Sequence, residues 1–141
     1  MKYDLSNEPV AVLDACALIA LLNDEQGADV VAQALETIPV VRISSVNLLE
    51  VAYDAVRKTG RQEAAREIID DVRKLGVTVD FAVSEEMIPA ASVFKTSFRI
   101  SLADAIVLVL AATHEAPVVT SDRAEFGPVE EDRAARFIWI R

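Results

Sequence analysis

The stretch Val10-Ala11-Val12-Leu13-Asp14 places a lone carboxylate directly after a short apolar run. The run is continuous, rich in valine and bounded by polar residues, which is typical of a buried strand. Asp14 is the only charged residue between Glu8 and Asp24. Because an ionised carboxylate is rarely buried unless it is paired or binds a metal ion, this strand end is a candidate functional site.

Short apolar runs continue to alternate with longer amphipathic stretches along the chain. Five runs are predicted to be strands: Val10–Leu13, Val40–Ile43, Val77–Phe81, Pro117–Thr120 and Arg136–Ile140. Helical spacing predicts six helices: Ala17–Leu22, Gly27–Ile38, Val46–Lys58, Gln62–Leu75, Glu85–Ser97 and Leu102–His114. Since parallel strands need long crossovers, the expected fold class is α/β, with a parallel sheet covered on both faces.

Composition predicts one domain over residues 1–141, with hydrophobic residues at 52% of the sequence. No apolar stretch reaches the roughly 18 residues of a membrane helix, and no basic region precedes the apolar Val10–Leu22 segment. A cytoplasmic protein is therefore expected. The single cysteine, Cys16, forms no internal disulfide, which agrees with a reducing compartment. A zinc site of the Cys/His type is excluded.

The charge balance is acidic, with 23 acids against 14 bases and a net charge of -9. This balance argues against a protein that binds nucleic acid by bulk electrostatics, so a nucleic-acid substrate would need metal ions as local positive charge. Six basic residues are candidates for contacts with a phosphate backbone, although a solvated surface explains them equally well: Arg57, Lys58, Arg61, Lys95, Arg99 and Arg123.

Three further carboxylates, Glu50, Asp104 and Asp122, also stand in apolar surroundings. Each of the four acids also has a purely structural explanation. For Asp14 this explanation is a β-to-α turn or a helix cap. Asp104 follows Ser101 at the spacing of a helix capping box. Glu50 has the spacing to pair with Arg57, and Asp122 is a candidate loop or N-cap residue. One explanation that all four share is a site for a divalent cation.

Fold class predicts where such a site lies. Ligands of open α/β sheets bind beyond the carboxyl ends of the strands, and Asp14 and Asp122 each follow a predicted strand. Both are therefore expected to point into one crevice. Clustered carboxylates bind hard cations such as Mg²⁺, which activate water and neutralise charge on phosphoryl oxygens. This chemistry suits phosphodiester hydrolysis.

Four segments resemble the successive acidic motifs of PIN-domain ribonucleases: Val12–Leu18, Asn47–Val51, Ser101–Ala105 and Pro117–Arg123. Their order and spacing cover nearly the whole chain, and a free-standing domain of this length most resembles a VapC-like toxin of a type II toxin–antitoxin (VapBC) pair. The resemblance implies a PIN-like three-layer sandwich with a five-stranded parallel sheet flanked by helices. It also implies a metal-dependent endoribonuclease with Mg²⁺ or Mn²⁺ as cofactor, RNA as substrate, a homodimer, and inhibition by a VapB-like antitoxin. The catalytic and metal-binding residues it implies are Asp14, Glu50, Asp104 and Asp122.

Cys16 departs from the family pattern, which commonly has Ser or Thr two residues after the first aspartate. A thiol is a weaker hydrogen-bond donor than a hydroxyl, so Asp14 is expected to be oriented less firmly. A Cys/His nucleophilic pair is not expected, because His114 lies at the far end of its helix from Asp104. His114 is expected to interact with the helix dipole and Trp139 to belong to the core.

Two other classes of α/β protein fit the sequence less well, because the residues that each of them needs are absent. A response-regulator receiver would need paired acids after the first strand and a lysine after the penultimate one, and a dehalogenase-like phosphatase would need an aspartate in place of Cys16. Two alternatives keep the PIN fold: an RNA-processing nuclease outside any toxin–antitoxin system, and a catalytically weak binding module.

Overall fold

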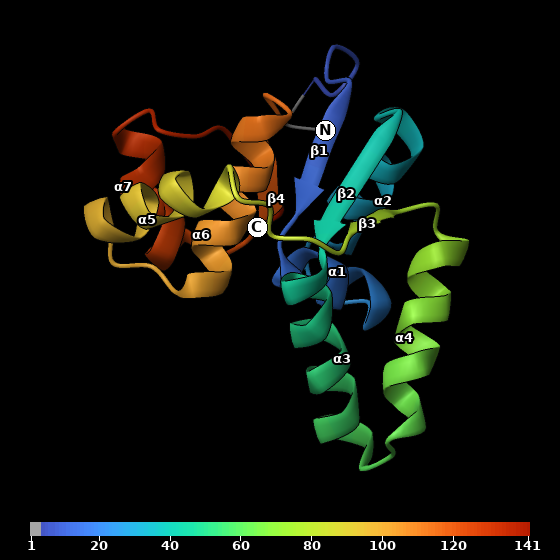
Figure 1. Cartoon of the computed structure of the whole chain (residues 1–141). Coiled ribbons are helices and arrows are strands. Elements are labelled where there is room, and N and C mark those ends of the chain that lie inside the picture. Colours follow the sequence, from blue (N-terminus) through green and yellow to red (C-terminus); the bar gives the residue numbers. More distant parts are fainter. Residues whose placement is uncertain (1–3) are drawn as a thin grey trace.

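The computed structural model describes residues 4–141 as helices packed on both faces of one parallel sheet (Figure 1). The strands are β1 (Val10–Leu13), β2 (Val40–Ser44), β3 (Thr78–Asp80), β4 (Val118–Thr120) and β5 (Phe137–Trp139). Every pairing is parallel, and the order across the sheet is β3-β2-β1-β4-β5. The predicted α/β class, with five parallel strands, is therefore confirmed.

Seven helices are formed within the described residues: α1 (Ala15–Leu22), α2 (Ala28–Thr37), α3 (Ser45–Thr59), α4 (Glu63–Lys74), α5 (Met87–Ser97), α6 (Leu102–Thr113) and α7 (Arg123–Glu131). The first six agree with the predicted helices to within two residues at each end. The seventh was not predicted. Gly127 and Pro128 lie in its middle, and both residues normally disfavour a helix interior. Complete burial of Phe126 and Val129 offsets that preference.

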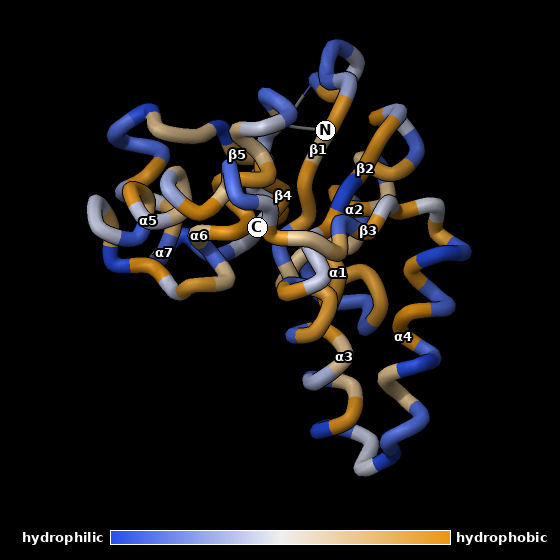
Figure 2. Tube along the Cα trace, in the orientation of Figure 1, coloured by the Kyte–Doolittle hydropathy of each residue, from blue (hydrophilic) through white to orange (hydrophobic). Residues whose placement is uncertain are grey.

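Successive residues of the strands point into two separate cores, as a sheet covered on both faces requires. In β1, Leu13 packs with α1 and α2, whereas Val12 packs with α6 and α7. In β4, Val119 and Val118 divide in the same way. Helix α6 is buried from Ala103 to Ala111, and Figure 2 shows much of this helix and of β1 in the colour of apolar residues. The helices α3 and α4 pack side by side and extend beyond the sheet (Figure 1).

The connections out of β1 and β4 run in opposite directions across the sheet. From β1 the chain continues to β2 and β3 on one side, and β4 continues to β5 on the other. The adjacent strands β1 and β4 therefore flank a topological switch point, where open α/β sheets leave a crevice at the carboxyl ends of the strands. Asp14 and Ser121 are the first residues beyond these two strand ends.

No helix in the described part of the chain is long and apolar enough to cross a membrane.

Substitution of Gly27, the N-cap of α2, tests how closely the residue after the edge strand β5 packs against the start of this helix. Its φ is +97°, and a Cβ there would lie 2.6 Å from the carbonyl oxygen of Ile140. Gly60 is a matched control, because its φ is +69° and no atom lies within 4 Å of the same position. Gly60→Ala is expected to lower the free energy of unfolding by about 1 kcal/mol, the cost of a left-handed backbone conformation. Gly27→Ala is expected to cost at least twice as much in urea denaturation, and equal losses would contradict the close contact with Ile140.

Candidate functional site

Asp14 lies at the switch point and is only 5% exposed. It is the N-cap of α1, and both of its carboxylate oxygens accept hydrogen bonds. The oxygen Oδ1 accepts from the backbone N–H of Ala15 at 2.9 Å and from Nδ2 of Asn47 at 3.4 Å. The oxygen Oδ2 accepts from Oγ1 of Thr120 at 2.9 Å and from the thiol of Cys16 at 3.4 Å. The cap alternative is therefore correct, and the carboxylate is also held by three neutral side chains.

Burial raises the pKa of Asp14 from 3.8 to about 6. The hydrogen bonds from Thr120, Cys16 and Ala15 lower this pKa, whereas the negative charge of Asp104 raises it further. Desolvation outweighs the hydrogen bonds because all of them come from neutral donors, and no lysine or arginine in residues 4–141 forms an ion pair with this carboxylate. Asp14 is a desolvated acid with no cation beside it.

Asp104 combines a structural role with membership of the same acidic group. It forms a complete capping box with Ser101, whose Oγ accepts from the N–H of Asp104 at 3.1 Å. In return, Oδ2 of Asp104 accepts from the N–H of Ser101 at 3.3 Å. Burial raises the pKa of Asp104, the hydrogen bonds from Ser101 lower it, and the charge of Asp122 raises it. The capping alternative is therefore correct and does not remove Asp104 from the site.

Glu50 reaches the group from α3 and is exposed at the surface. Desolvation raises its pKa, and the charges of Asp14 and Asp104 raise it further. The alternative pairing with Arg57 is wrong, because Arg57 donates to Asp54 at 2.7 Å. Within the described residues, Glu50 forms no salt bridge.

Asp122 follows β4 as the N-cap of α7, where its Oδ1 accepts from the N–H of Glu125 at 3.1 Å. Its own N–H donates to Oγ1 of Thr120 at 3.1 Å, so the hydroxyl that bonds Asp14 also orients this turn. The charge of Asp122 raises the pKa of Asp104. Charge repulsion thus connects the four predicted acids. The charge of Asp104 raises the pKa values of Asp14 and Glu50, and the charge of Asp122 raises the pKa of Asp104.

This linkage is looser than a preformed metal centre. Across residues 4–141, no three His, Cys, Asp or Glu side chains are gathered closely enough to hold a metal ion as they stand.

Three polar residues of the site were not predicted from the sequence: Ser44, Asn47 and Thr120. All are buried, at 4%, 0% and 0% exposure. Thr120 ends β4, and the register of β4 with β1 places it level with Asp14. The register of β1 with β2 places Ser44 level with Asp14 as well. A signal was available in Ser44 and Asn47, because their spacing is that of an N-cap and its third helical residue.

Cys16 takes the place of a hydroxyl in this network. Its Sγ lies 3.4 Å from Oδ2 of Asp14 and 3.3 Å from Oγ1 of Thr120, and it accepts from the N–H of Ser121 at 3.4 Å. Burial raises the pKa of the Cys16 thiol, and the charge of Asp14 raises it further. The protonated thiol is a weak donor to Asp14. His114, the C-cap of α6, is at the other end of that helix from Asp104.

The basic residues near the end of α3 are engaged with acids of the protein itself. Arg57 and Lys58 both pair with Asp54, at 2.7 Å and 3.0 Å. Arg61 pairs with Glu67 at 2.6 Å. These pairs favour the solvated-surface interpretation of the three bases.

Two of the remaining candidate cations are also held within the fold. Lys95 donates to the carbonyl of Ile100 at 2.9 Å. The guanidinium of Arg123 lies 4.5 Å from the ring centroid of Trp139, a cation–π contact. Trp139 is 7% exposed, as expected for a core residue. Arg99 forms no salt bridge within residues 4–141.

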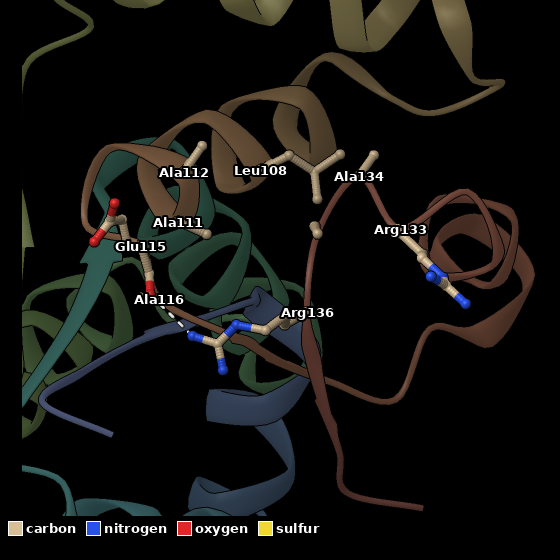
Figure 3. Close-up of a pocket in the computed structure, with 9 residues that line it drawn as sticks. Leu108, Ala111, Ala112, Glu115, Ala116, Arg133, Ala134 and Arg136 are labelled. Atoms are coloured by element: carbon tan, nitrogen blue, oxygen red, sulfur yellow. Dashed lines mark hydrogen bonds between the residues drawn. The ribbon is translucent and has the colours of Figure 1, made fainter. Parts of the chain in front are cut away.

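A hollow of about 500 Å³ lies beside the C-terminal half of α6 and the loop before β5, at the opposite end of α6 from Asp104 (Figure 3). Arg136 lies in its wall and donates to the carbonyl of Glu115 at 2.9 Å. It also forms a salt bridge with Glu8 at 2.5 Å. This hollow contains none of the four acids and is separate from the candidate site.

The sequence and the fold of the chain are similar to those of known proteins. The sequence matches the PIN domain family over residues 11–130. A toxin–antitoxin complex from Klebsiella pneumoniae contains a similar structure, with a TM-score of 0.68 and 20% identity over 93% of this chain and 98% of that chain. VapBC2 from Rickettsia felis, solved with a promoter DNA fragment, gives a TM-score of 0.69 and 15% identity over 92% and 97%.

A third similar structure is VapC20 of Mycobacterium tuberculosis, described as a toxin that cleaves the sarcin–ricin loop. Its TM-score is 0.62, with 18% identity over 77% of this chain and 86% of that chain. No curated protein sequence matches the chain. At these identities, the solved structures establish a shared fold.

The raised pKa of Asp14 predicts a specific dependence of stability on pH. Because the folded value of about 6 exceeds the unfolded value of 3.8, the folded state binds more protons between them, and the contribution of Asp14 is lost as pH rises through 6. The size of this loss is up to about 3 kcal/mol. Asp14→Asn removes the titrating carboxyl group. The free energy of unfolding of the variant is therefore expected to rise relative to that of wild type as the pH increases from 4 to 7. Urea denaturation in the presence of a chelator measures this difference, and parallel pH profiles would refute it.

Proposed function

The chain belongs to the PIN-domain family, and from this premise we propose that it is a metal-dependent endoribonuclease and the toxin of a toxin–antitoxin pair. The observation that supports a nuclease best is the desolvated carboxylate of Asp14 at the sheet switch point, repelled by the charge of Asp104. Such an arrangement is unfavourable on its own and becomes favourable when a cation is bound.

The donor set suits a hard divalent cation. Asp14, Glu50, Asp104 and Asp122 offer carboxylate oxygens, the ligands that Mg²⁺ and Mn²⁺ prefer, and the thiol of Cys16 remains protonated. In the proposed site these four acids hold the cation. A bound Mg²⁺ or Mn²⁺ activates a water molecule and neutralises the charge that develops on the phosphate oxygens.

The residues around Asp14 orient the acids in this proposal. Thr120 donates to Asp14 and accepts from the N–H of Asp122, so one hydroxyl fixes the relation between the two strand ends. The capping box places the carboxylate of Asp104 at the first turn of α6. Glu50, exposed on α3, is the member of the set with the greatest freedom to adjust when a ligand binds.

The charge distribution supports a substrate that is bound through the cation. The net charge is -9, and five of the six candidate cations are engaged within the fold. Bulk attraction of RNA is therefore weak, and the metal supplies the local positive charge. VapC20 is described as a toxin that cleaves the sarcin–ricin loop, and we assign RNA as the substrate class here from this shared fold and from the PIN-domain match.

The proposed partners are a VapB-like antitoxin and a second copy of the chain. The similar structures from Klebsiella pneumoniae and Rickettsia felis are toxin–antitoxin assemblies, which supports the antitoxin. The homodimer is supported by large apolar side chains, each more than half exposed, on α3, α5, the segment after β3 and the start of α6. They are Leu49, Tyr53, Phe81, Ile88, Val93 and Leu102. In this proposal these side chains contribute to the interface, since exposed apolar patches on soluble proteins commonly mark protein–protein contacts.

Substitution of the buried acids tests the enzymatic proposal. Asp14→Asn and Asp104→Asn are each expected to reduce RNA cleavage at least about 100-fold, because the loss of a ligand charge weakens cation binding. The near-isosteric amide preserves packing. Asp54→Asn is the control, since Asp54 is an acid of α3 that pairs with Arg57 and Lys58. Cleavage of total RNA with Mg²⁺, Mn²⁺ or a chelator measures the effect, and wild-type rates in either site variant would mean that the site assignment is wrong.

The toxin role predicts an effect on growth. Expression of the chain alone is expected to slow growth of the host, and co-expression with the product of an adjacent small reading frame is expected to relieve it. Asp104→Asn is the control and should be harmless at equal expression. A wild-type protein that cleaves RNA in vitro and leaves growth unchanged would instead support an RNA-processing nuclease outside a toxin–antitoxin system.

A further inference from the structure

Asn47, like Thr120, is a polar residue next to the acids with no exposed surface. It is not one of the four acids and lies one turn before Glu50 on α3. Its Nδ2 lies 3.4 Å from Oδ1 of Asp14, the oxygen that otherwise accepts only from the N–H of Ala15. A buried amide costs free energy unless its donors and acceptors are paired, so the direction of this group matters.

The hydroxyl of Ser44 determines which end of the Asn47 amide faces Asp14. Ser44 Oγ accepts the N–H of Asn47 at 3.1 Å, as the N-cap of α3. The same hydroxyl donates its proton to Oδ1 of Asn47. Since the amide oxygen is engaged with Ser44, the NH₂ group is left to face the carboxylate. The reverse orientation would place a carbonyl oxygen against Asp14 and leave the hydroxyl proton of Ser44 without its acceptor.

We propose that Asn47, oriented by Ser44, is a positioning residue that holds the carboxylate of Asp14 for cation binding. The chain of contacts runs from Ser44 to Asn47 to Asp14, and it joins the ends of the paired strands β1 and β2. Thr120 holds the other oxygen from β4, so the carboxylate plane is defined from both sides of β1. Loss of a residue that hydrogen-bonds to a metal ligand typically lowers metal affinity by about 10- to 100-fold.

This inference rests on the proposed function, because it requires a cation at Asp14. The test is the dissociation constant for Mn²⁺, measured by electron paramagnetic resonance on the whole chain, together with the melting temperature in chelator. Asn47→Leu keeps the branching at Cγ, has methyl groups in place of the amide oxygen and nitrogen, and lacks both side-chain hydrogen bonds. It is expected to raise the dissociation constant by about 10- to 100-fold. Ser45→Ala is the matched control, since the Ser45 hydroxyl lies in the same helical turn and donates to the carbonyl of Phe81 instead.

A second pair of variants keeps the proposal testable if Asn47→Leu does not fold. Ser44→Ala removes the hydroxyl that orients the amide and is expected to weaken Mn²⁺ binding. Ser44→Thr retains a hydroxyl that both accepts and donates, and it is expected to restore wild-type affinity. Equal affinities for Ser44→Ala and Ser44→Thr would overturn the proposal.

The remaining outcomes separate this inference from the proposed function. If wild type binds Mn²⁺ and Asn47→Leu binds it within about twofold, the positioning role is overturned and the metal-dependent nuclease stands. A loss in Ser45→Ala as large as that in Asn47→Leu also overturns it, because a general loosening of α3 would then explain both. If wild type binds no Mn²⁺ and cleaves no RNA, the proposed function and this inference fail together.

Discussion

The structure depends on the burial of one negative charge at the centre of its sheet. Asp14 follows the middle strand, is 5% exposed and has no cationic partner within residues 4–141. Four neutral donors make that burial tolerable, and they come from α1, the first turn of α3 and the end of β4. Any change in the relation of these elements leaves the carboxylate unsatisfied, so the crevice and the fold are stabilised together.

The same constraint explains why the bases of the protein stay away from the acids. Arg57, Lys58 and Arg61 satisfy acids elsewhere, and Arg123 is held against Trp139. A protein cation beside Asp14 would relieve the repulsion permanently and compete with a metal ion. Hydrogen bonds from neutral groups lower the cost of burial and leave the negative charge available. The site is thus stable enough to form and still favours a divalent cation.

Local patterns in the sequence were sufficient to predict the strands and six helices, because apolar periodicity is a local property. The same patterns singled out the four acids as candidates. Helix α7 was missed because its stability comes from burial of Phe126, which outweighs the local effect of Pro128. Asn47 and Thr120 were missed for a different reason. They are 33 and 106 positions from Asp14, and only the sheet register brings them to it. The resemblance to a family supplied the acids as a set, whereas their supporting hydrogen bonds required coordinates.

The pairing of β1 with β4 also has a consequence for the order of events during synthesis. The hydrogen bond between Thr120 and Asp14 spans 106 positions, so no nascent chain that stops short of residue 120 is able to form it. Until β4 has emerged and inserted beside β1, Asp14 lacks its shortest side-chain hydrogen bond, and Asp122 is not in place beside it. Contacts of such long range also form slowly, because a large loop must close first. The acidic crevice is therefore a late product of translation and folding, and shorter ribosome-bound intermediates are without it.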